Sequence, residues 1–194
     1  MFSEKTTTVV GLIHRAEHAG KKVQAFKPLL DDRWGTQNIK SHNGIEYKAT
    51  TVKIPSEIIA NLETDTDFVA IDEVQFFDTN IIEVVRYLTE SNIEVVFAGL
   101  PLDFKGEPFG SMPELLAMAD EVVNLTAVCK HISKDGRQCN RDATRTQRIV
   151  NGQPANYEDP IVFIGADESY TARCVEHHIV PDRPKPKIIY QASE

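Results

Sequence analysis

Two adjacent carboxylates that follow an apolar run are the residues with the clearest chemical potential. Residues 68–71 are apolar and run directly into Asp72 and Glu73, which is the arrangement of a Walker B strand. In an open α/β sheet, ligands bind beyond the carboxyl ends of the strands, so Asp72 is predicted to hold Mg²⁺, directly or through water. Glu73 faces the opposite side of the strand, where it could accept a proton from a substrate hydroxyl. The alternative is a solvated strand end without a ligand.

The first six residues are a candidate for phosphate binding. A P-loop reads G-x-x-x-x-G-K-[ST] between a strand and a helix, and Lys5 and Thr6 match its phosphate lysine and its Mg²⁺ hydroxyl. Glu4 replaces the second glycine, and the first glycine and its strand would fall before Met1. Because backbone N–H groups must approach phosphate closely, a charged side chain at position 4 opposes binding. The alternative is an ordinary helix start.

The elements that must position these residues alternate between helix and strand. Apolar residues at helical spacing predict helices over residues 9–16, 81–88 and 112–119, and Gly20 supplies a stop for the first. Short apolar runs between turn residues predict buried strands at residues 23–26, 68–71, 95–98 and 122–128. This alternation predicts an α/β fold with a parallel sheet.

Composition and charge exclude several classes of protein. The chain has 194 residues and a formal net charge of −8, which argues against a general nucleic-acid binder. No apolar run approaches the roughly 20 residues that span a bilayer, and the N-terminus does not resemble a secretory signal. A cytoplasmic location without membrane attachment is therefore expected. An odd set of three cysteines, all in the last third, suggests a local metal site rather than a disulfide framework.

The sequence pattern changes near residue 129. Residues 1–128 are predicted to form a nucleotide-binding α/β domain whose first strand is missing. Residues 129–181 are rich in turn formers, Cys, His and Arg, which predicts a small second domain without a large core. Residues 182–194 are charged and begin with a proline-interrupted run, so a flexible tail is expected there.

Eight segments, taken together and in order, carry a family resemblance. They are residues 1–6, 26–28 with 31–33, 41–44, 72–77, 103–109, 125–129, 146–148 and 168–174. In this order they resemble the cellular and bacterial (type II) thymidine kinase family, over residues 1 to about 181. The resemblance implies a RecA-like P-loop parallel sheet with a small zinc-bearing lasso domain. It implies transfer of the ATP γ-phosphate to the 5′-hydroxyl of thymidine, which gives dTMP, or to that of deoxyuridine. It also implies a homotetramer that dTTP inhibits.

The resemblance assigns roles by position. Glu73 matches the general base, and the residues that match the nucleotide and Mg²⁺ site are Lys5, Thr6, Asp31, Arg33 and Asp72. The residues that match the nucleoside pocket are Met1, Phe76, Phe104, Phe109, Thr146, Phe163, Gly165 and Tyr170. For the phenylalanines the alternative is core packing, and Tyr170 could equally anchor the small domain.

A structural zinc site is also implied by the resemblance. Family members carry a Cys-x-x-Cys pair, whereas nine residues separate Cys129 from Cys139 here, so residues 131–138 read as an insertion into the first knuckle. The second arm is Cys174 with His177. These four residues are the proposed ligands of a closed tetrahedral site, with His131 and His178 as alternative ligands. Three free thiols without a metal are the other interpretation.

Three functions follow from these patterns. The first is an ATP-dependent thymidine kinase with Glu73 as base. The second is a catalytically impaired nucleoside-binding or nucleotide-binding homologue, suggested by Glu4 and the missing glycine. The third is a zinc-ribbon nucleic-acid adaptor, suggested by Cys and Arg residues between 129 and 148. The acidic charge and the Walker B strand argue against the third.

Overall fold

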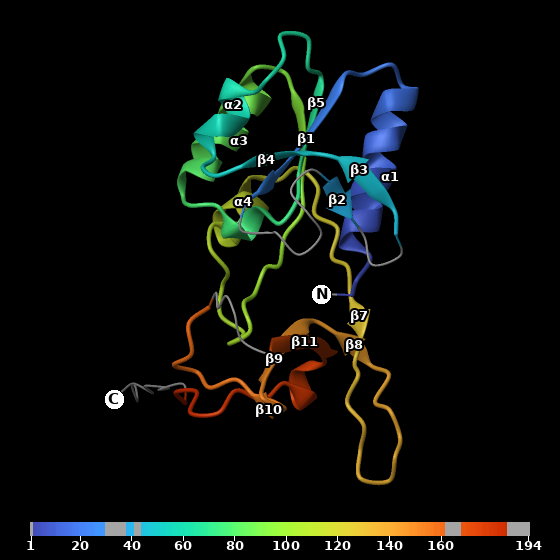
Figure 1. Cartoon of the computed structure of the whole chain (residues 1–194), viewed down its shortest axis with the longest axis vertical. Helices are drawn as coiled ribbons and strands as arrows, with labels where there is room; N and C mark the ends of the chain where they lie inside the picture. Colours follow the sequence, from blue (N-terminus) through green and yellow to red (C-terminus); the bar gives the residue numbers. More distant parts are fainter. Residues whose placement is uncertain (1, 30–37, 41–43, 162–167, 186–194) are drawn as a thin grey trace, which may run out of the picture.

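The computed structural model describes residues 2–29, 38–40, 44–161 and 168–185. The chain forms two lobes, shown one above the other in Figure 1. The sheet lobe contains the elements from α1 (Lys5–His18) to α4 (Met112–Met118), and the cysteine lobe contains those from β7 (Ala127–Val128) to the short helix η2 (Val175–His177). None of the helices in these ranges is long and apolar enough to cross a membrane.

A four-stranded parallel sheet forms the centre of the sheet lobe. Its strand order is β4 (Thr50–Val52), β1 (Val23–Pro28), β5 (Phe68–Ile71) and β6 (Glu94–Phe97). All three neighbouring pairs are parallel. The predicted α/β fold with a parallel sheet is therefore confirmed.

Both faces of the sheet are covered, which explains the continuous apolar run of β5. Residues Phe68 and Ala70 pack with the buried face of α1, whereas Val69 and Ile71 pack with α2 (Ser56–Ala60) and α3 (Asn80–Glu90). Figure 1 shows α1 on one side of the sheet and these two helices on the other. A strand that is buried on both faces needs apolar side chains at every position.

The predicted helices and three of the predicted strands are present. The helix α1 ends before Gly20, which adopts a positive φ of 78°, the conformation that commonly ends helices. Further short elements complete the lobe. They are β2 (Asn38–Lys40), β3 (Glu46–Lys48), and the 3-10 helix η1 (Val74–Phe76) that follows β5. Strands β2 and β3 pair antiparallel beside the main sheet.

The prediction of a strand at residues 122–128 is wrong for most of this segment. Only Ala127 and Val128 form a strand, and they pair antiparallel with β8 (Asp142–Ala143) in the cysteine lobe. Val122 and Val123 are exposed. A short apolar run becomes a strand only where a neighbouring strand pairs with its backbone groups, and within the described residues no strand lies beside residues 122–126.

The strand β6 has an open edge. It pairs with β5 on one side and has no second partner strand in the described parts of the chain. Its residues Val95, Val96 and Phe97 are consequently only half-buried, whereas all four residues of β5 are buried. The sheet therefore ends in an apolar strand whose outer backbone groups are unpaired by sheet hydrogen bonds.

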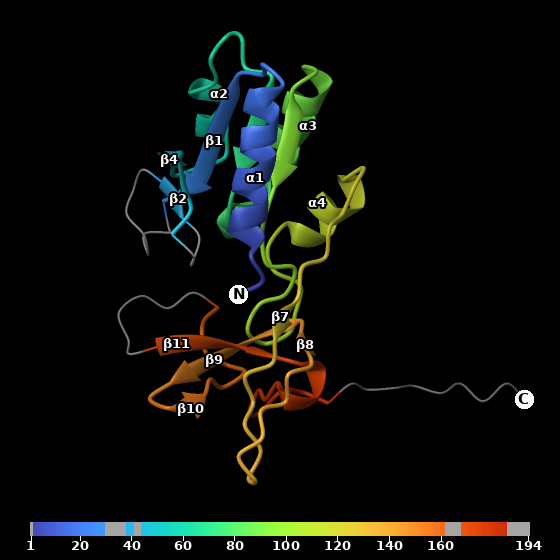
Figure 2. The same cartoon turned by 90° about the vertical axis from the view of Figure 1, so that its right-hand side faces the viewer.

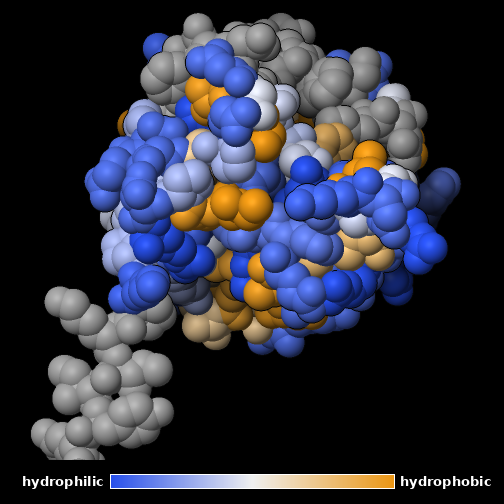
Figure 3. Space-filling view, turned by 90° about the horizontal axis from the view of Figure 1, so that it is seen from below, coloured by the Kyte–Doolittle hydropathy of each residue, from blue (hydrophilic) through white to orange (hydrophobic). Residues whose placement is uncertain are grey.

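The cysteine lobe is built from short antiparallel strands. Its main sheet has the order β10 (Gln153–Pro154), β9 (Arg145–Val150) and β11 (Glu168–Arg173). Figure 2 shows this sheet below the N-terminus of α1, with a hairpin at residues 129–139 extending downward. On the face seen in Figure 3, hydrophobic residues form separate patches among hydrophilic ones. The predicted domain boundaries stay predictions. The first of them follows residue 128, and β7, which ends at that residue, pairs with β8 on the other side of this boundary.

Candidate active site and metal centre

The carboxylates predicted from sequence lie at the carboxyl end of β5. Asp72 is buried and its N–H donates to the carbonyl of Phe26 in β1. Glu73 is half-buried and has a φ of 50° and a ψ of 41°, in the left-handed region. A residue other than glycine is strained in this region by roughly 1–2 kcal/mol, and such strain is frequent at functional sites.

The start of α1 meets these carboxylates. Lys5 Nζ lies 2.5 Å from Asp72 Oδ1 and 3.3 Å from Glu73 Oε1. The hydroxyl of Thr6 donates to Asp72 Oδ2 at 3.2 Å. The four residues predicted to serve phosphate and Mg²⁺ chemistry are therefore in direct contact, although more than sixty positions separate the two pairs in sequence.

The electrostatics of this cluster are those of a buried cation between two acids. Burial by itself would lower the pKa of Lys5, but the charges of Glu73 and Asp72 and the hydrogen bonds to both outweigh it, so this pKa is raised. Burial raises the pKa of Asp72, with the charge of Glu73 acting in the same direction and that of Lys5 opposing it. Lys5 is therefore kept in its charged form. A further positive charge near Asp72 would favour the ionised form of that carboxylate.

Glu4 adopts a left-handed backbone conformation. Its φ is 59° and its ψ is 23°, in the left-handed region, which glycine enters without strain. Its carboxylate accepts a hydrogen bond from Thr7 Oγ1 at 2.8 Å and makes no cap hydrogen bond to the helix backbone. Position 4 therefore has a backbone conformation that glycine would adopt more easily, and it places a negative charge at the end of a helix that favours anions.

Gln75 is a site residue that sequence reasoning missed. It is buried, and its Nε2 donates to Glu73 Oε2 at 2.5 Å while its Oε1 accepts from the N–H of Leu100 at 3.1 Å. Two glycines make room for it. A Cβ at Gly99 would lie 2.6 Å from Gln75 Oε1, and one at Gly110 would lie 2.6 Å from the Gln75 carbonyl oxygen. In the sequence, the one feature that could have indicated this role is the polar amide of Gln75 between the apolar residues Val74 and Phe76.

Two predicted aromatic residues lie together beside the carboxylates. The rings of Phe76 and Phe109 meet edge to face, with centroids 5.5 Å apart. Phe104 is buried, its ring lies 5.2 Å from the Arg148 guanidinium, and its carbonyl lies 2.8 Å from His178 Nε2. The loop that carries Phe104 and Phe109 therefore contacts both η1 and the cysteine lobe.

The remaining predicted pocket residues divide into two groups. Thr146 is buried on β9, and Tyr170 is half-buried on β11, where it pairs with Arg148. The others lie outside the described residues; they are Met1, Asp31, Arg33, Phe163 and Gly165.

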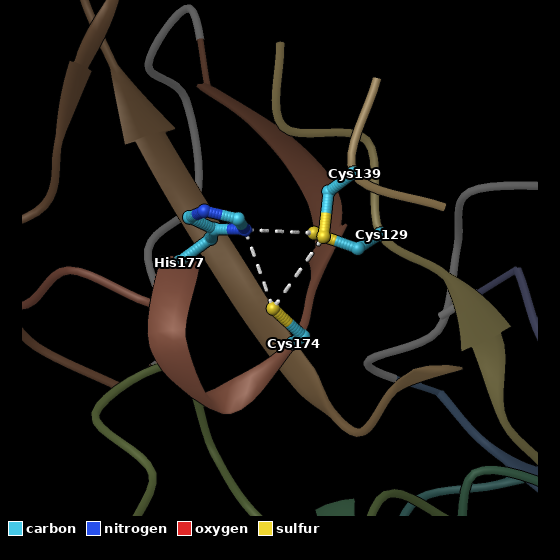
Figure 4. A group of neighbouring side chains, drawn as sticks. All are labelled: Cys129, Cys139, Cys174 and His177. Atoms are coloured by element: carbon cyan, nitrogen blue, oxygen red, sulfur yellow. Dashed lines mark hydrogen bonds between the residues drawn. The ribbon is translucent and has the colours of Figure 1, made fainter. Parts of the chain in front are cut away.

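The four predicted metal ligands converge in the cysteine lobe (Figure 4). One ligand atom from each of Cys129, Cys139, Cys174 and His177 lies within 4.8 Å of all the others. His177 Nδ1 is 3.3 Å from Cys174 Sγ and 3.7 Å from Cys129 Sγ, and Cys139 Sγ is 4.0 Å from Cys174 Sγ. Tetrahedral zinc with ordinary bond lengths places its ligand atoms about 3.5–3.8 Å apart, so the cluster fits zinc.

The protonation tendencies of the cluster are mixed. Burial raises the pKa of Cys174, whereas the backbone N–H of Arg141 lowers the pKa of Cys139. Burial also lowers the pKa of His177, which favours the neutral imidazole that binds metal. The alternative ligands have other contacts: His131 stacks on His177, and His178 contacts the Phe104 carbonyl. The donor set with no open position is that of a structural site.

Comparison with known protein families agrees with this geometry. The family model described as thymidine kinase matches residues 1–178. The match spans α1, the carboxylates after β5 and the whole Cys₃His cluster. The chain therefore belongs to the thymidine kinase family.

Proposed function

We propose that the protein is an ATP-dependent thymidine kinase that transfers the γ-phosphate of ATP to the 5′-hydroxyl of thymidine or deoxyuridine. Membership of the thymidine kinase family supports a nucleoside kinase function, with thymidine and ATP as the implied substrates. The observation that carries the proposal is the direct contact of Lys5 and Thr6 with Asp72 and Glu73. That contact unites a phosphate-binding helix start with a Walker B carboxylate.

Phosphoryl transfer depends mainly on positioning and on neutralising charge. In the proposal, Asp72 and Thr6 hold Mg²⁺, since both supply an oxygen atom at the place where the N-terminus of α1 meets the end of β5. Bound Mg²⁺ would neutralise the charge on the phosphates. Lys5, which lies between Asp72 and Glu73 at the start of α1, would bind the phosphate oxygens of ATP.

Glu73 is proposed to accept the proton of the nucleoside 5′-hydroxyl. A general base must be held within hydrogen-bond reach of the proton it removes. The left-handed turn at Glu73 and the hydrogen bond from Gln75 both fix the direction of its carboxylate. Gln75 is itself held by the N–H of Leu100, so the base rests on a rigid support.

The nucleoside is proposed to bind between the two lobes, with its base among Phe76, Phe104 and Phe109. Thr146 and Tyr170 would face it from the cysteine lobe. The resemblance adds Phe163 and Gly165 to that side and Met1 to the side of the three phenylalanines; these three residues lie outside the described parts of the chain. A flat apolar slot suits a pyrimidine, and one methyl group changes binding only modestly, so thymidine and deoxyuridine would both be accepted. Asp31 and Arg33 would lie near the phosphates. Inhibition by dTTP and a homotetrameric assembly belong to the same proposal.

Replacing Glu73 tests the proposal. For Glu73→Gln we expect kcat for thymidine phosphorylation to fall by about 100-fold or more, because general-base catalysis is lost. Thymidine affinity and the melting temperature should change little. The matched control is Glu83→Gln, at an exposed carboxylate on α3 that pairs with Arg86, which should keep parental kcat. Equal rates for Glu73→Gln and the parent would show that Glu73 is not the base.

A second function is favoured by one observation, the carboxylate of Glu4 at the N-terminus of α1. A negative charge there repels phosphates, which would give an impaired homologue that binds thymidine or dTTP without turnover. Calorimetric titration with thymidine, together with an assay for dTMP, separates the two functions. Binding without product formation in the parent chain supports the impaired homologue, and product formation supports the kinase.

A further inference from the structure

The hairpin at residues 129–139 is ordered by its own hydrogen bonds. The N–H of Cys139 donates to the His131 carbonyl at 2.9 Å, and Gln138 Nε2 donates to the Cys129 carbonyl at 3.3 Å. Nearer the tip, the N–H of Ser133 donates to the Arg137 carbonyl at 2.9 Å. The insertion therefore closes on itself, so that Cys129 and Cys139 meet despite the nine residues between them.

The same hairpin places an aromatic ring on the metal cluster. The rings of His131 and His177 are stacked, with centroids 3.9 Å apart and an angle of 19° between their planes. His131 also accepts the hydrogen bond from the N–H of Cys139. One residue of the insertion therefore contacts ligands from both arms of the cluster.

His177 lies at the end of a short element, where a neighbouring ring can set its orientation. It is the last residue of η2, a single turn of 3-10 helix, and it is only half-buried. Its Nδ1 must face the sulfur atoms of Cys129 and Cys174 to complete the tetrahedron. A ring stacked on one face limits rotation about the side-chain bonds, while leaving the nitrogen at the edge available to a metal.

We propose that His131 is a positioning residue for the metal centre, and that its stacked ring holds His177 with Nδ1 directed at the three cysteines. The role belongs to the ring rather than to its nitrogen atoms, since His131 is not a member of the Cys₃His group. Groups that orient metal ligands are known to affect metal affinity strongly. The inference rests on the metal cluster and is independent of kinase activity.

The test compares two substitutions in the full-length protein. His131→Ala removes the ring, whereas His131→Phe keeps a flat ring that stacks but cannot bind metal. Zinc affinity, measured by competition with a chromophoric chelator, should fall by about three- to tenfold for His131→Ala. His131→Phe should retain parental affinity. Ile132→Ala, at the exposed neighbouring residue, is the control and should also match the parent.

Cobalt substitution provides a second readout, which separates a positioning role of His131 from a role as a metal ligand. The visible absorption bands of Co²⁺ report three sulfur ligands and one nitrogen ligand. His131→Ala and His131→Phe should leave the band positions unchanged, whereas His177→Ala should shift them. The proposal is overturned if His131→Phe is as weak as His131→Ala, or if His131→Ala binds zinc like the parent. It is also overturned if His131→Ala shifts the bands as His177→Ala does.

Discussion

The two lobes reach order by different physical means. The sheet lobe buries large side chains on both faces of a parallel sheet, among them Phe26, Ile71 and Leu88. The buried cluster of the cysteine lobe consists of small residues only: Ala127, Cys129, Ala143, Ala172 and Cys174, with Cys139 packed against it. Such a cluster removes little apolar surface from water. The comparison indicates that apolar burial stabilises the first lobe, and it leads us to expect that metal binding stabilises the second.

Removing the metal should show this difference most strongly. Structural zinc contributes an apparent binding free energy of about 10–16 kcal/mol in small domains, so chelation should unfold the cysteine lobe and leave the sheet lobe folded. Amide resonances of residues 127–178 should collapse in an NMR spectrum after treatment with a chelator, whereas those of β1 and β5 should persist. Unchanged resonances in both lobes would mean that the cysteine lobe does not depend on metal.

A cavity in the sheet lobe should have the opposite effect. Ile71→Ala removes a fully buried side chain from β5, and we expect the free energy of unfolding to fall by about 2–5 kcal/mol. Urea denaturation of the zinc-loaded protein measures this change. Zinc affinity should remain at the parental value. Ile132→Ala, at a side chain that is 64% exposed in the cysteine lobe, should change stability by less than about 0.5 kcal/mol.

Glu4→Gly tests whether the phosphate loop of the sheet lobe is limited by its charge. Glycine should relieve the left-handed strain and raise the free energy of unfolding by roughly 1 kcal/mol. The loss of the carboxylate should also tighten ATP binding, measured by calorimetry. The matched control is Asn92→Gly, where φ is 60°, because it changes a left-handed position in the turn between α3 and β6. If both variants leave ATP affinity unchanged, the charge of Glu4 does not limit binding.

The smallest expected effect is a pH dependence within the sheet lobe. Burial, and then a hydrogen bond to Glu17, raises the pKa of Tyr47 to about 12. The folded state therefore binds this proton more tightly than the unfolded state, and stability should decrease as the pH rises from about 10 to about 12. Solvent screening should keep the loss below about 1 kcal/mol. Thermal melts of Tyr47→Phe should lack this component of the pH dependence.

Local sequence patterns predicted the parts of the fold that depend on local order. The helices α1, α3 and α4 follow from apolar spacing, and β1, β5 and β6 follow from short apolar runs. The short polar strand β4 could not be predicted, because its pairing with β1 is its main support. The strand predicted at residues 122–126 did not form, because this segment has no strand beside it among the described residues, although it contains apolar side chains.

The candidate site divides in the same way. Motif positions predicted that Lys5 would meet Asp72 and that three cysteines would meet His177, and the structure brings both groups together. Gln75 escaped prediction, and His131 was expected only as an alternative ligand rather than in the positioning role we propose, because these roles depend on contacts at a distance. Gln75 matters through two glycines that approach it from beyond β6, and His131 matters through a ring that lies 46 positions along the chain.

Two neighbouring histidines connect the metal cluster of one lobe to a loop of the other lobe. His177 directs Nδ1 toward the cysteines, while His178, the next residue, contacts the Phe104 carbonyl through Nε2 at 2.8 Å. Linkage between binding sites is reciprocal. If metal at the Cys₃His group strengthens the binding of a ligand at the Phe104 loop, that ligand strengthens metal binding by the same factor. Metal retention during dialysis would then rise when such a ligand is bound.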